Sequence, residues 1–197
     1  MNRLILFSGG VESTALLALK SPEDIVITIE DISPNNKTQT FNRTAIYEIS
    51  RAMNVPVQFC QYSIPYAHQH IPHYGDPNWY HQLWTFLPLV SVYLTKNSLI
   101  NEIWIGTSLD DETAEFRYRK KYPQLIAGWN ILYPHVSITL PLSNLTTEQI
   151  WYIIPNTIKP LIRNCFNNTT NEIDKNCGIC PKCIKLKKLP GSCLYQM

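Results

Sequence analysis

Three cysteines near the C-terminal end of the chain follow one another at intervals of two intervening residues: Cys177, Cys180 and Cys183. Cys165 precedes them, so that the full pattern is C-x₁₁-C-G-x-C-x₂-C. This spacing lets a turn direct several sulfur atoms at one ion, and four thiolates form a closed, tetrahedral zinc site. We therefore expect these four cysteines to hold a structural zinc ion. An iron–sulfur cluster is the alternative, but the C-x₃-C-P run that completes the ferredoxin pattern is absent.

Two of the six cysteines lie outside this set. Cys193 is an alternative fourth ligand, although its place near the terminus favours Cys165. Cys60 ends an apolar run and is expected to be a small buried hydrophobic residue. The apolar run at the start of the chain is too short for a signal peptide. We therefore expect a cytoplasmic protein, in which cysteines bind metals more often than they form disulfides.

A second group of polar residues follows the first apolar run, where residues 7–14 read FSGGVEST. Paired glycines let the backbone turn tightly and direct its N–H groups at an anion, and the dipole of a following helix adds partial positive charge. Ser8, Ser13 and Thr14 would add hydroxyl donors, and the Glu12 carboxylate would hold a magnesium ion on phosphate oxygens. An ordinary strand-to-helix turn with capping hydroxyls is the alternative.

The elements around these motifs alternate between strand and helix. Apolar and β-branched runs predict strands at residues 3–7, 24–32, 55–60, 100–106 and 136–140. Helical spacing of apolar residues predicts helices at residues 12–20, 40–53, 83–96 and part of 115–133, and a short helix opened by residues 146–148. The alternation predicts an α/β fold with a doubly wound, parallel, five-stranded sheet. We expect one domain at residues 1–160, with a cysteine-rich, zinc-binding tail at residues 161–197 packed on it.

Composition excludes several classes of protein. The 17 Lys and Arg residues against 15 Asp and Glu residues leave a formal net charge of +2, which gives no reason to expect bulk nucleic acid or an acidic membrane as a partner. No uninterrupted apolar stretch approaches the length of a membrane span. Hydrophobic residues make up 45% of the chain, enough for a sizeable core.

Four further stretches have residue types that could bind a ligand. Residues 62–84 are rich in aromatic and histidine side chains, and residues 63–81 are expected to form a loop over a site. A second metal ion on four histidines there is the less favoured interpretation: His68, His70, His73 and His81. Basic and aromatic residues alternate at 116–122, a pattern more ordinary for a helix surface. Four lysines surround the cysteines, and offsetting the negative charge of a tetrathiolate site is favoured over RNA binding: Lys182, Lys185, Lys187 and Lys188. An acidic turn, at residues 110–112, follows the fourth expected strand.

Residues 7–14 resemble the pyrophosphatase loop, S-G-G-x-D-S, of the adenine nucleotide α-hydrolase superfamily, whose members cleave ATP to AMP and pyrophosphate in order to adenylate a substrate. Combined with the four-cysteine pattern, in a chain near 200 residues, this loop resembles one family in particular, the 7-cyano-7-deazaguanine synthases. Residues 103–106, with the acidic turn and Glu115-Phe116 behind them, are similar to that family's strand-four substrate loop. Residues 141–146 resemble its next landmark.

This resemblance implies an ATP-dependent C–N ligase of queuosine biosynthesis. The carboxylate of 7-carboxy-7-deazaguanine would attack the α-phosphate of ATP, giving an acyl-adenylate and pyrophosphate. Ammonia would displace AMP to form an amide, and a second adenylation with loss of water would give the nitrile. The implied ATP-binding residues, with magnesium on Glu12, are Phe7, Ser8, Gly9, Gly10, Val11, Glu12, Ser13 and Thr14. The implied substrate-binding residues are Asp110, Asp111, Glu115 and Phe116, for whose carboxylates loop solvation and helix N-capping are the alternative roles.

Three positions on the ATP side differ from the family. Glu12 replaces an aspartate, Thr147 replaces a lysine, and residues 79–99 contain no arginine where the family has an Arg-Asn pair. Three hypotheses follow: a nitrile-forming synthase; a relative that stops at the amide or joins the deazaguanine acid to another amine, such as a partner protein in a defence-type system; and a non-catalytic nucleotide- or partner-binding module. A homodimer and a partner protein both remain open.

Overall fold

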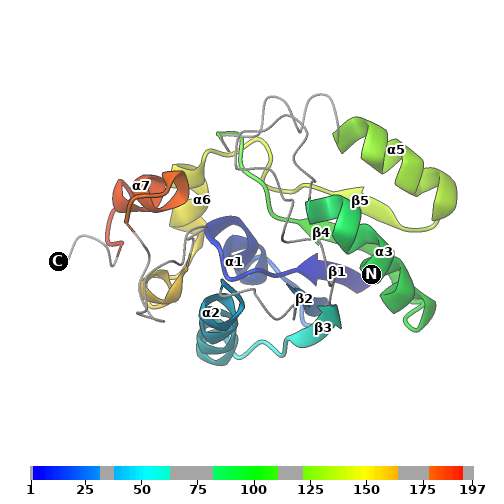
Figure 1. Ribbon diagram of the computed structural model, residues 1–197, viewed down its shortest axis with the longest axis horizontal. Helices are drawn as coiled ribbons and strands as arrows, with labels where there is room; N and C mark the ends of the chain where they lie inside the picture. The colour runs from blue at the N-terminus through cyan, green and yellow to red at the C-terminus, as the bar shows by residue number, and fades with distance from the viewer. Residues whose placement is uncertain (1, 32–37, 63–81, 111–121, 164–177, 193–197) are drawn as a thin grey trace.

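The computed structural model describes residues 2–31, 38–62, 82–110, 122–163 and 178–192 (Figure 1). The elements in chain order are β1 (Asn2–Leu6), α1 (Val11–Ala18), β2 (Ile25–Asp31), α2 (Thr38–Met53), β3 (Gln58–Tyr62), α3 (Gln82–Thr95), β4 (Ile100–Ile105), α5 (Tyr122–Leu132), β5 (Ser137–Thr139), α6 (Thr147–Ile153), the 3₁₀ helix η3 (Lys159–Leu161) and α7 (Pro181–Lys187).

The sheet has five strands in the order β3-β2-β1-β4-β5, and every neighbouring pair is parallel. The chain first builds outward from β1 to β3 and then returns to place β4 on the other side of β1. The order of the strands therefore reverses between β1 and β4, and ligands of open α/β sheets bind outside the carboxyl ends of the strands at such a point. The predicted doubly wound, five-stranded parallel sheet is confirmed.

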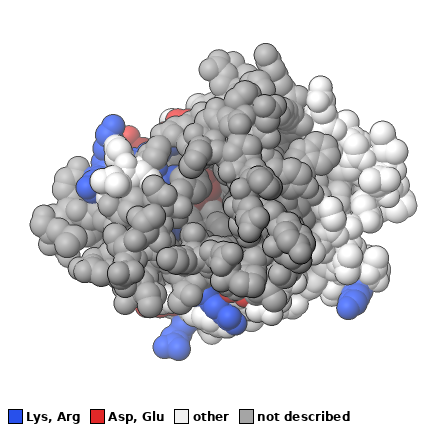
Figure 2. Space-filling view, viewed as in Figure 1, with Lys and Arg blue, Asp and Glu red and all other residues white. Residues whose placement is uncertain are grey.

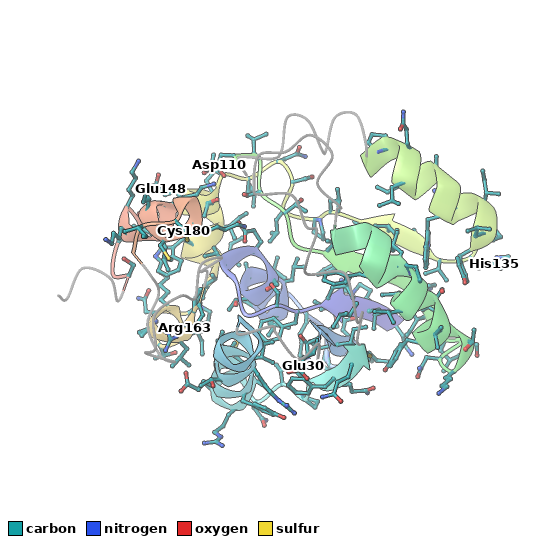
Figure 3. The ribbon with its side chains drawn as sticks, viewed as in Figure 1. Glu30, Asp110, His135, Glu148, Arg163 and Cys180 are labelled. Carbon is teal, nitrogen blue, oxygen red and sulfur yellow. The ribbon has the colours of Figure 1, made fainter. Side chains whose placement is uncertain are left out.

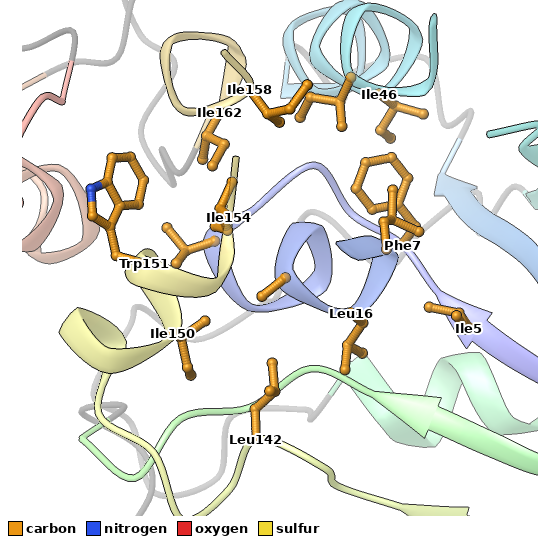
Figure 4. Close-up of a cluster of buried hydrophobic side chains, with 14 of the residues drawn as sticks. Ile5, Phe7, Leu16, Ile46, Leu142, Ile150, Trp151, Ile154, Ile158 and Ile162 are labelled. Atoms are coloured by element: carbon orange, nitrogen blue, oxygen red, sulfur yellow. The ribbon is translucent and has the colours of Figure 1, made fainter. Parts of the chain in front are cut away.

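Two hydrophobic cores cover the two faces of the sheet, because successive strand residues point to opposite sides. Ile5 of β1 belongs to the core formed with α1, α2, α6 and α7, which Figure 4 shows in close-up. Leu4 belongs to the second core, formed with α3 and α5.

The C-terminal residues are part of the first core. Ile162, Leu186 and Leu189 are all buried there. Trp151 of α6 is fully buried, and its indole Nε1 donates a hydrogen bond of 2.8 Å to the carbonyl of Pro190. The described part of the cysteine-rich segment is thus packed against the same helices that cover the sheet.

The third strand begins three residues later than the sequence predicts. The helix before it ends at Met53. The next residue, Asn54, has a left-handed φ of 52°, and the Val55 N–H bonds back to the carbonyl of Ser50. Pro56 has no N–H to give to a strand ladder. Val55 is therefore part of the helix end, and pairing with β2 runs from Gln58 to Tyr62.

Helix α3 continues through Pro88 from Gln82 to Thr95. The proline removes one helical hydrogen bond, and the hydroxyl of Ser91 donates to the Pro88 carbonyl at 2.7 Å. None of the helices in the described ranges is long and apolar enough to cross a membrane.

The amino-terminal edge of the sheet is held by an ion pair between Arg3 and Asp24. The two guanidinium contacts measure 2.9 and 2.6 Å, the Asp24 side chain is fully buried, and the Arg3 guanidinium lies 4.0 Å from the ring centroid of Trp104. Burial alone would raise the pKa of Asp24, but hydrogen bonds from Arg3 and Ser21 outweigh it and hold the pKa below its ordinary value.

We predict that Asp24→Asn lowers the free energy of unfolding by about 3 kcal/mol at pH 7, because it leaves a partly buried guanidinium without its counter-charge. A lowered folded-state pKa adds stability above the ordinary Asp value of 3.8, and that stability is lost as the pH falls below it. Urea unfolding at pH 7 and pH 3 should show the difference between variant and wild type shrinking in acid. Glu23→Gln, at an exposed neighbour, should change little at either pH.

Candidate functional site

The loop between β1 and α1 carries the glycine pair that the sequence singles out. Gly9 has a φ of 77°, a left-handed conformation that favours glycine. Gly10 is the N-cap of α1 in an extended conformation, and no side chain caps the helix. Because Gly10 has no side chain to accept hydrogen bonds, the first N–H groups of α1 have no side-chain cap. Such N–H groups favour the binding of an anion.

The hydroxyls of this loop are linked to one another. Ser8 N–H donates to Ser13 Oγ at 3.2 Å, the two serine Oγ atoms lie 3.1 Å apart, and Ser13 Oγ–H donates to the Gly10 carbonyl at 3.3 Å. Ser13 is buried whereas Ser8 is exposed. These bonds hold the turn together and leave the Ser8 side chain accessible to a ligand.

The end of β4 approaches the first turn of α1 at Gly106. A Cβ built at Gly106 would lie 2.8 Å from the backbone nitrogen of Ser13 and 2.9 Å from the carbonyl carbon of Glu12. Because both neighbours are backbone atoms, only glycine fits there without a shift. Two buried hydroxyl oxygens on either side of this contact, Thr14 Oγ1 and Thr107 Oγ1, have no hydrogen-bond partner in the structure as described.

Glu12 lies in the first turn of α1 and is 8% exposed. Among the described residues, the hydroxyl of Ser108, in the loop after β4, donates to Glu12 Oε1 at 3.4 Å. A buried carboxylate with so weak a contact is costly to keep charged unless a cation or further donors compensate it. The position therefore fits an oxygen ligand of a hard divalent cation such as magnesium.

Asp110, a predicted substrate residue, lies beside the start of α6 and beside α7 (Figure 3). Its Oδ1 accepts hydrogen bonds from the Thr147 N–H at 2.8 Å and the Thr147 hydroxyl at 2.9 Å. Its Oδ2 forms an ion pair with Lys185 Nζ at 3.1 Å, and Lys185 also donates to the Asp110 carbonyl at 2.7 Å. Asp110 thus accepts a hydrogen bond from the first N–H of α6, a contact similar to helix N-capping. Helix N-capping is the role that the sequence analysis gives as the alternative to substrate binding.

The charge of Asp110 is stabilised by these contacts. Burial acts to raise its pKa, but hydrogen bonds from Thr147 and Lys185 together with the Lys185 charge outweigh burial, so the pKa lies below the ordinary value. The lysine that the resembled family has at position 147 is absent here, and α7 instead brings the Lys185 ammonium to the partner of Thr147.

The described cysteines of the predicted metal site open α7. Cys180 is the N-cap, Cys183 lies one turn on, and both are buried. The N–H of Cys183 donates to Cys180 Sγ at 3.5 Å. Gly178 has a φ of 72°, and a Cβ there would meet Lys187 Nζ at 3.1 Å, so an ammonium lies at this turn. These features fit a metal–thiolate site.

Several predicted site residues lie outside the described residues: Asp111, Glu115, Phe116, Cys165, Cys177 and the four histidines of residues 62–84. Among the residues that are described, no three His, Cys, Asp or Glu side chains form a metal-binding group. His135, which Figure 3 labels, lies at the α5–β5 end, away from Asp110 and Cys180. On the face in Figure 2, the described Lys and Arg side chains form separate small groups.

Sequence reasoning did not single out Ser108 or Arg163. Ser108 is 1% exposed and links Glu12 to Thr147, whose Oγ1 lies 3.1 Å from Ser108 Oγ. The backbone N–H of Arg163 donates to the Gly9 carbonyl at 3.3 Å. Ser108 could have been noticed in the sequence as a small polar residue two positions after the glycine that follows a predicted strand. The Arg163 contact is made by the backbone, so no residue type in the sequence indicates it.

The fold is similar to that of a solved structure, the U34-tRNA thiolase NcsA from Methanococcus maripaludis with its 4Fe–4S cluster, with a TM-score of 0.52 at 14% sequence identity. The match covers 78% of this chain and 56% of that chain, so this chain spans little more than half of that protein's length. No protein-family model and no curated protein matches the chain. A likeness at this identity shows the fold alone, and it agrees with the predicted α/β architecture built on a parallel sheet.

We predict that Gly106→Ala lowers the free energy of unfolding by about 2 kcal/mol, because its methyl group must push the α1 backbone away from β4. Gly128→Ala is the matched control: nothing lies within 4 Å of a Cβ at this exposed position of α5, so alanine should stabilise by about 1 kcal/mol. Chemical unfolding of both variants checks the pair. Equal stabilities for the two variants would contradict the close approach.

Proposed function

We propose that the chain is an ATP-dependent adenylating enzyme that activates the carboxylate of 7-carboxy-7-deazaguanine, or of a similar deazapurine acid, for attack by ammonia or another amine. The observation that carries this proposal is the meeting of an uncapped helix N-terminus, an extended and a left-handed glycine, and a buried carboxylate at the point where the strand order reverses. Phosphate groups are the ligands that such an arrangement suits.

The residues have separate roles in this proposal. Backbone N–H groups of residues 9–12 and the accessible Ser8 hydroxyl would bind the phosphates of ATP. Glu12 would hold magnesium, which when bound neutralises charge on the pyrophosphate leaving group. Ser108 orients the Glu12 carboxylate through its hydroxyl. Catalysis of this kind is mostly positioning and charge stabilisation, since nucleophile and leaving group both come from the substrates.

The fold is compatible with a tRNA-modifying setting, since the protein with the similar fold is a U34-tRNA thiolase. That similarity does not extend to the substrate of this chain, for which the motif pattern is the support. The net charge of +2 suits a small anionic substrate at a local loop better than a long polyanion.

We predict that incubation with ATP, magnesium, ammonia and 7-carboxy-7-deazaguanine releases pyrophosphate. Glu12→Gln should reduce the rate by about 100-fold or more, because a neutral amide cannot hold the cation, and Glu12→Asp should retain activity. Glu148→Gln, an exposed carboxylate on the first turn of α6, is the matched control and should be unaffected.

The products of that reaction separate the three hypotheses. Nitrile identifies a synthase, and amide or an amine adduct identifies a relative that stops earlier or conjugates. Absence of substrate-dependent pyrophosphate release by the wild type would overturn the enzyme proposal and leave a binding module.

We propose that Cys180 and Cys183, with Cys165 and Cys177, hold one structural zinc ion that stabilises the C-terminal segment. Four thiolates leave no open position for a reactant, so the ion would supply stability and no step of the reaction. Elemental analysis should give about one zinc per chain. Cys183→Ser should lose the metal, whereas Cys60→Ser should keep it, because burial raises the pKa of the Cys60 thiol and keeps it protonated. Finding iron in place of zinc would overturn the assignment and favour a cluster.

A further inference from the structure

Helix α7 contacts the loop after β4 through Lys185. Lys185, five residues after Cys180, places its Nζ 2.7 Å from the Asp110 carbonyl and 3.1 Å from Asp110 Oδ2. Asp110 lies four residues after Gly106, which follows β4. An ammonium that contacts both the backbone and the carboxylate of one residue fixes its position more firmly than an ordinary surface ion pair, which is worth little.

A chain of hydrogen bonds continues from Asp110 to Glu12. Asp110 Oδ1 lies 2.9 Å from Thr147 Oγ1, which lies 3.1 Å from Ser108 Oγ, which lies 3.4 Å from Glu12 Oε1. Thr147 Oγ1 is the donor toward both Asp110 Oδ1 and Ser108 Oγ, and its one proton is shared between these two acceptors. Ser108 Oγ donates in turn to Glu12 Oε1.

These contacts make the position of Ser108 depend on Asp110. While Lys185 holds Asp110 in place, Asp110 and Thr147 fix the Ser108 hydroxyl, which donates to Glu12. The Ser108–Glu12 contact is 3.4 Å long, so it orients the carboxylate and leaves its charge available to a cation. Without Lys185 the loop that carries Ser108 and Asp110 can shift, and the Glu12 carboxylate then loses this orientation.

The upstream side of the cysteine-rich segment contacts the same site independently. The Arg163 N–H bonds to the carbonyl of Gly9, in the glycine turn itself. The described residues on both sides of the cysteines are therefore each joined to one of the two loops at the β1–β4 switch point, Arg163 to the β1 loop and Lys185 to the β4 loop.

We infer that Lys185 is a positioning residue: through Asp110, Thr147 and Ser108 it keeps the Glu12 carboxylate available for the magnesium ion of bound ATP, so that the C-terminal cysteine segment sets the cation affinity of the nucleotide site. The inference rests on the proposed function, because it takes ATP with a divalent cation as the ligand. It adds a role for α7 that neither the loop motif nor the cysteine pattern contains.

The test is the magnesium dependence of ATP binding, measured by calorimetry at a series of magnesium concentrations. Lys185→Met keeps the aliphatic stem and removes the charge, and it should raise the magnesium concentration for half-maximal binding by about 5- to 10-fold. ATP binding without magnesium should stay unchanged, a split that general destabilisation would not produce. Lys185→Arg should restore most of the wild-type behaviour. Lys188→Met, at an exposed lysine that ends the same helix, is the control and should match wild type.

A second variant tests the route of the coupling. Thr147→Val keeps the backbone N–H bond to Asp110 and removes the hydroxyl between Asp110 and Ser108. It should give the same magnesium shift as Lys185→Met, and the double variant should shift no further, because both changes break one chain of contacts. Hydrogen exchange of the Thr147 amide should speed up in Lys185→Met and reports on the folded protein even where binding is weak.

The outcomes separate this inference from the proposed function. Wild-type protein that binds no ATP at any magnesium concentration overturns the proposed function. Wild-type protein that binds ATP with a magnesium dependence equal to that of Lys185→Met, or additive shifts in the double variant, overturns the inference and leaves the proposed function standing.

Discussion

A close backbone approach between the tip of β4 and the first turn of α1 organises the residues of the site around it. At Gly106 a single extra carbon would lie under 3 Å from two backbone atoms of α1. That contact is made where the sheet changes direction, so the loops after β1 and β4 are forced to face each other. Glu12, Ser108 and the glycine turn face each other because these two strands and α1 fit together without a side chain between them.

The two carboxylates of this region have opposite surroundings, and that contrast gives the site its electrostatic character. Asp110 is compensated fully by the Lys185 ammonium and two donors from Thr147, and its pKa is lowered accordingly. Glu12 is more deeply buried and has one long contact from a neutral hydroxyl. A satisfied carboxylate serves as a structural anchor, whereas an under-compensated one attracts a cation. Asp110 is thus suited to hold the loop in position, and Glu12 is suited to bind a cation.

Patterns with short-range physical causes were predictable from the sequence. Alternating apolar runs and helical spacing gave the five strands and the sheet class, and the glycine pair marked the turn after the first strand. The start of the third strand was missed because the hydrogen bond between Val55 and Ser50 belongs to the helix end. The sequence does not decide whether Asp110 binds substrate or caps a helix, because its partners, Thr147 and Lys185, are 37 and 75 residues away in sequence. No spacing rule connects residues at such separations, since only tertiary packing brings them together.

The C-terminal segment is bound to the domain by forces of three kinds, and this bears on why a cysteine cluster belongs on such a fold. Leu186 and Leu189 bury apolar surface in the core shared by α1 and α6, Trp151 donates to the Pro190 carbonyl, and Lys185 pairs with Asp110. A seven-residue helix such as α7 is too short to be stable alone. Its position therefore depends on these contacts and on the proposed metal ion, which would bind Cys180 and Cys183 at its first turn. A metal bound there would stabilise a helix that contacts the β4 loop through Lys185, so the proposed metal site and the proposed nucleotide site are joined by packing as well as by charge.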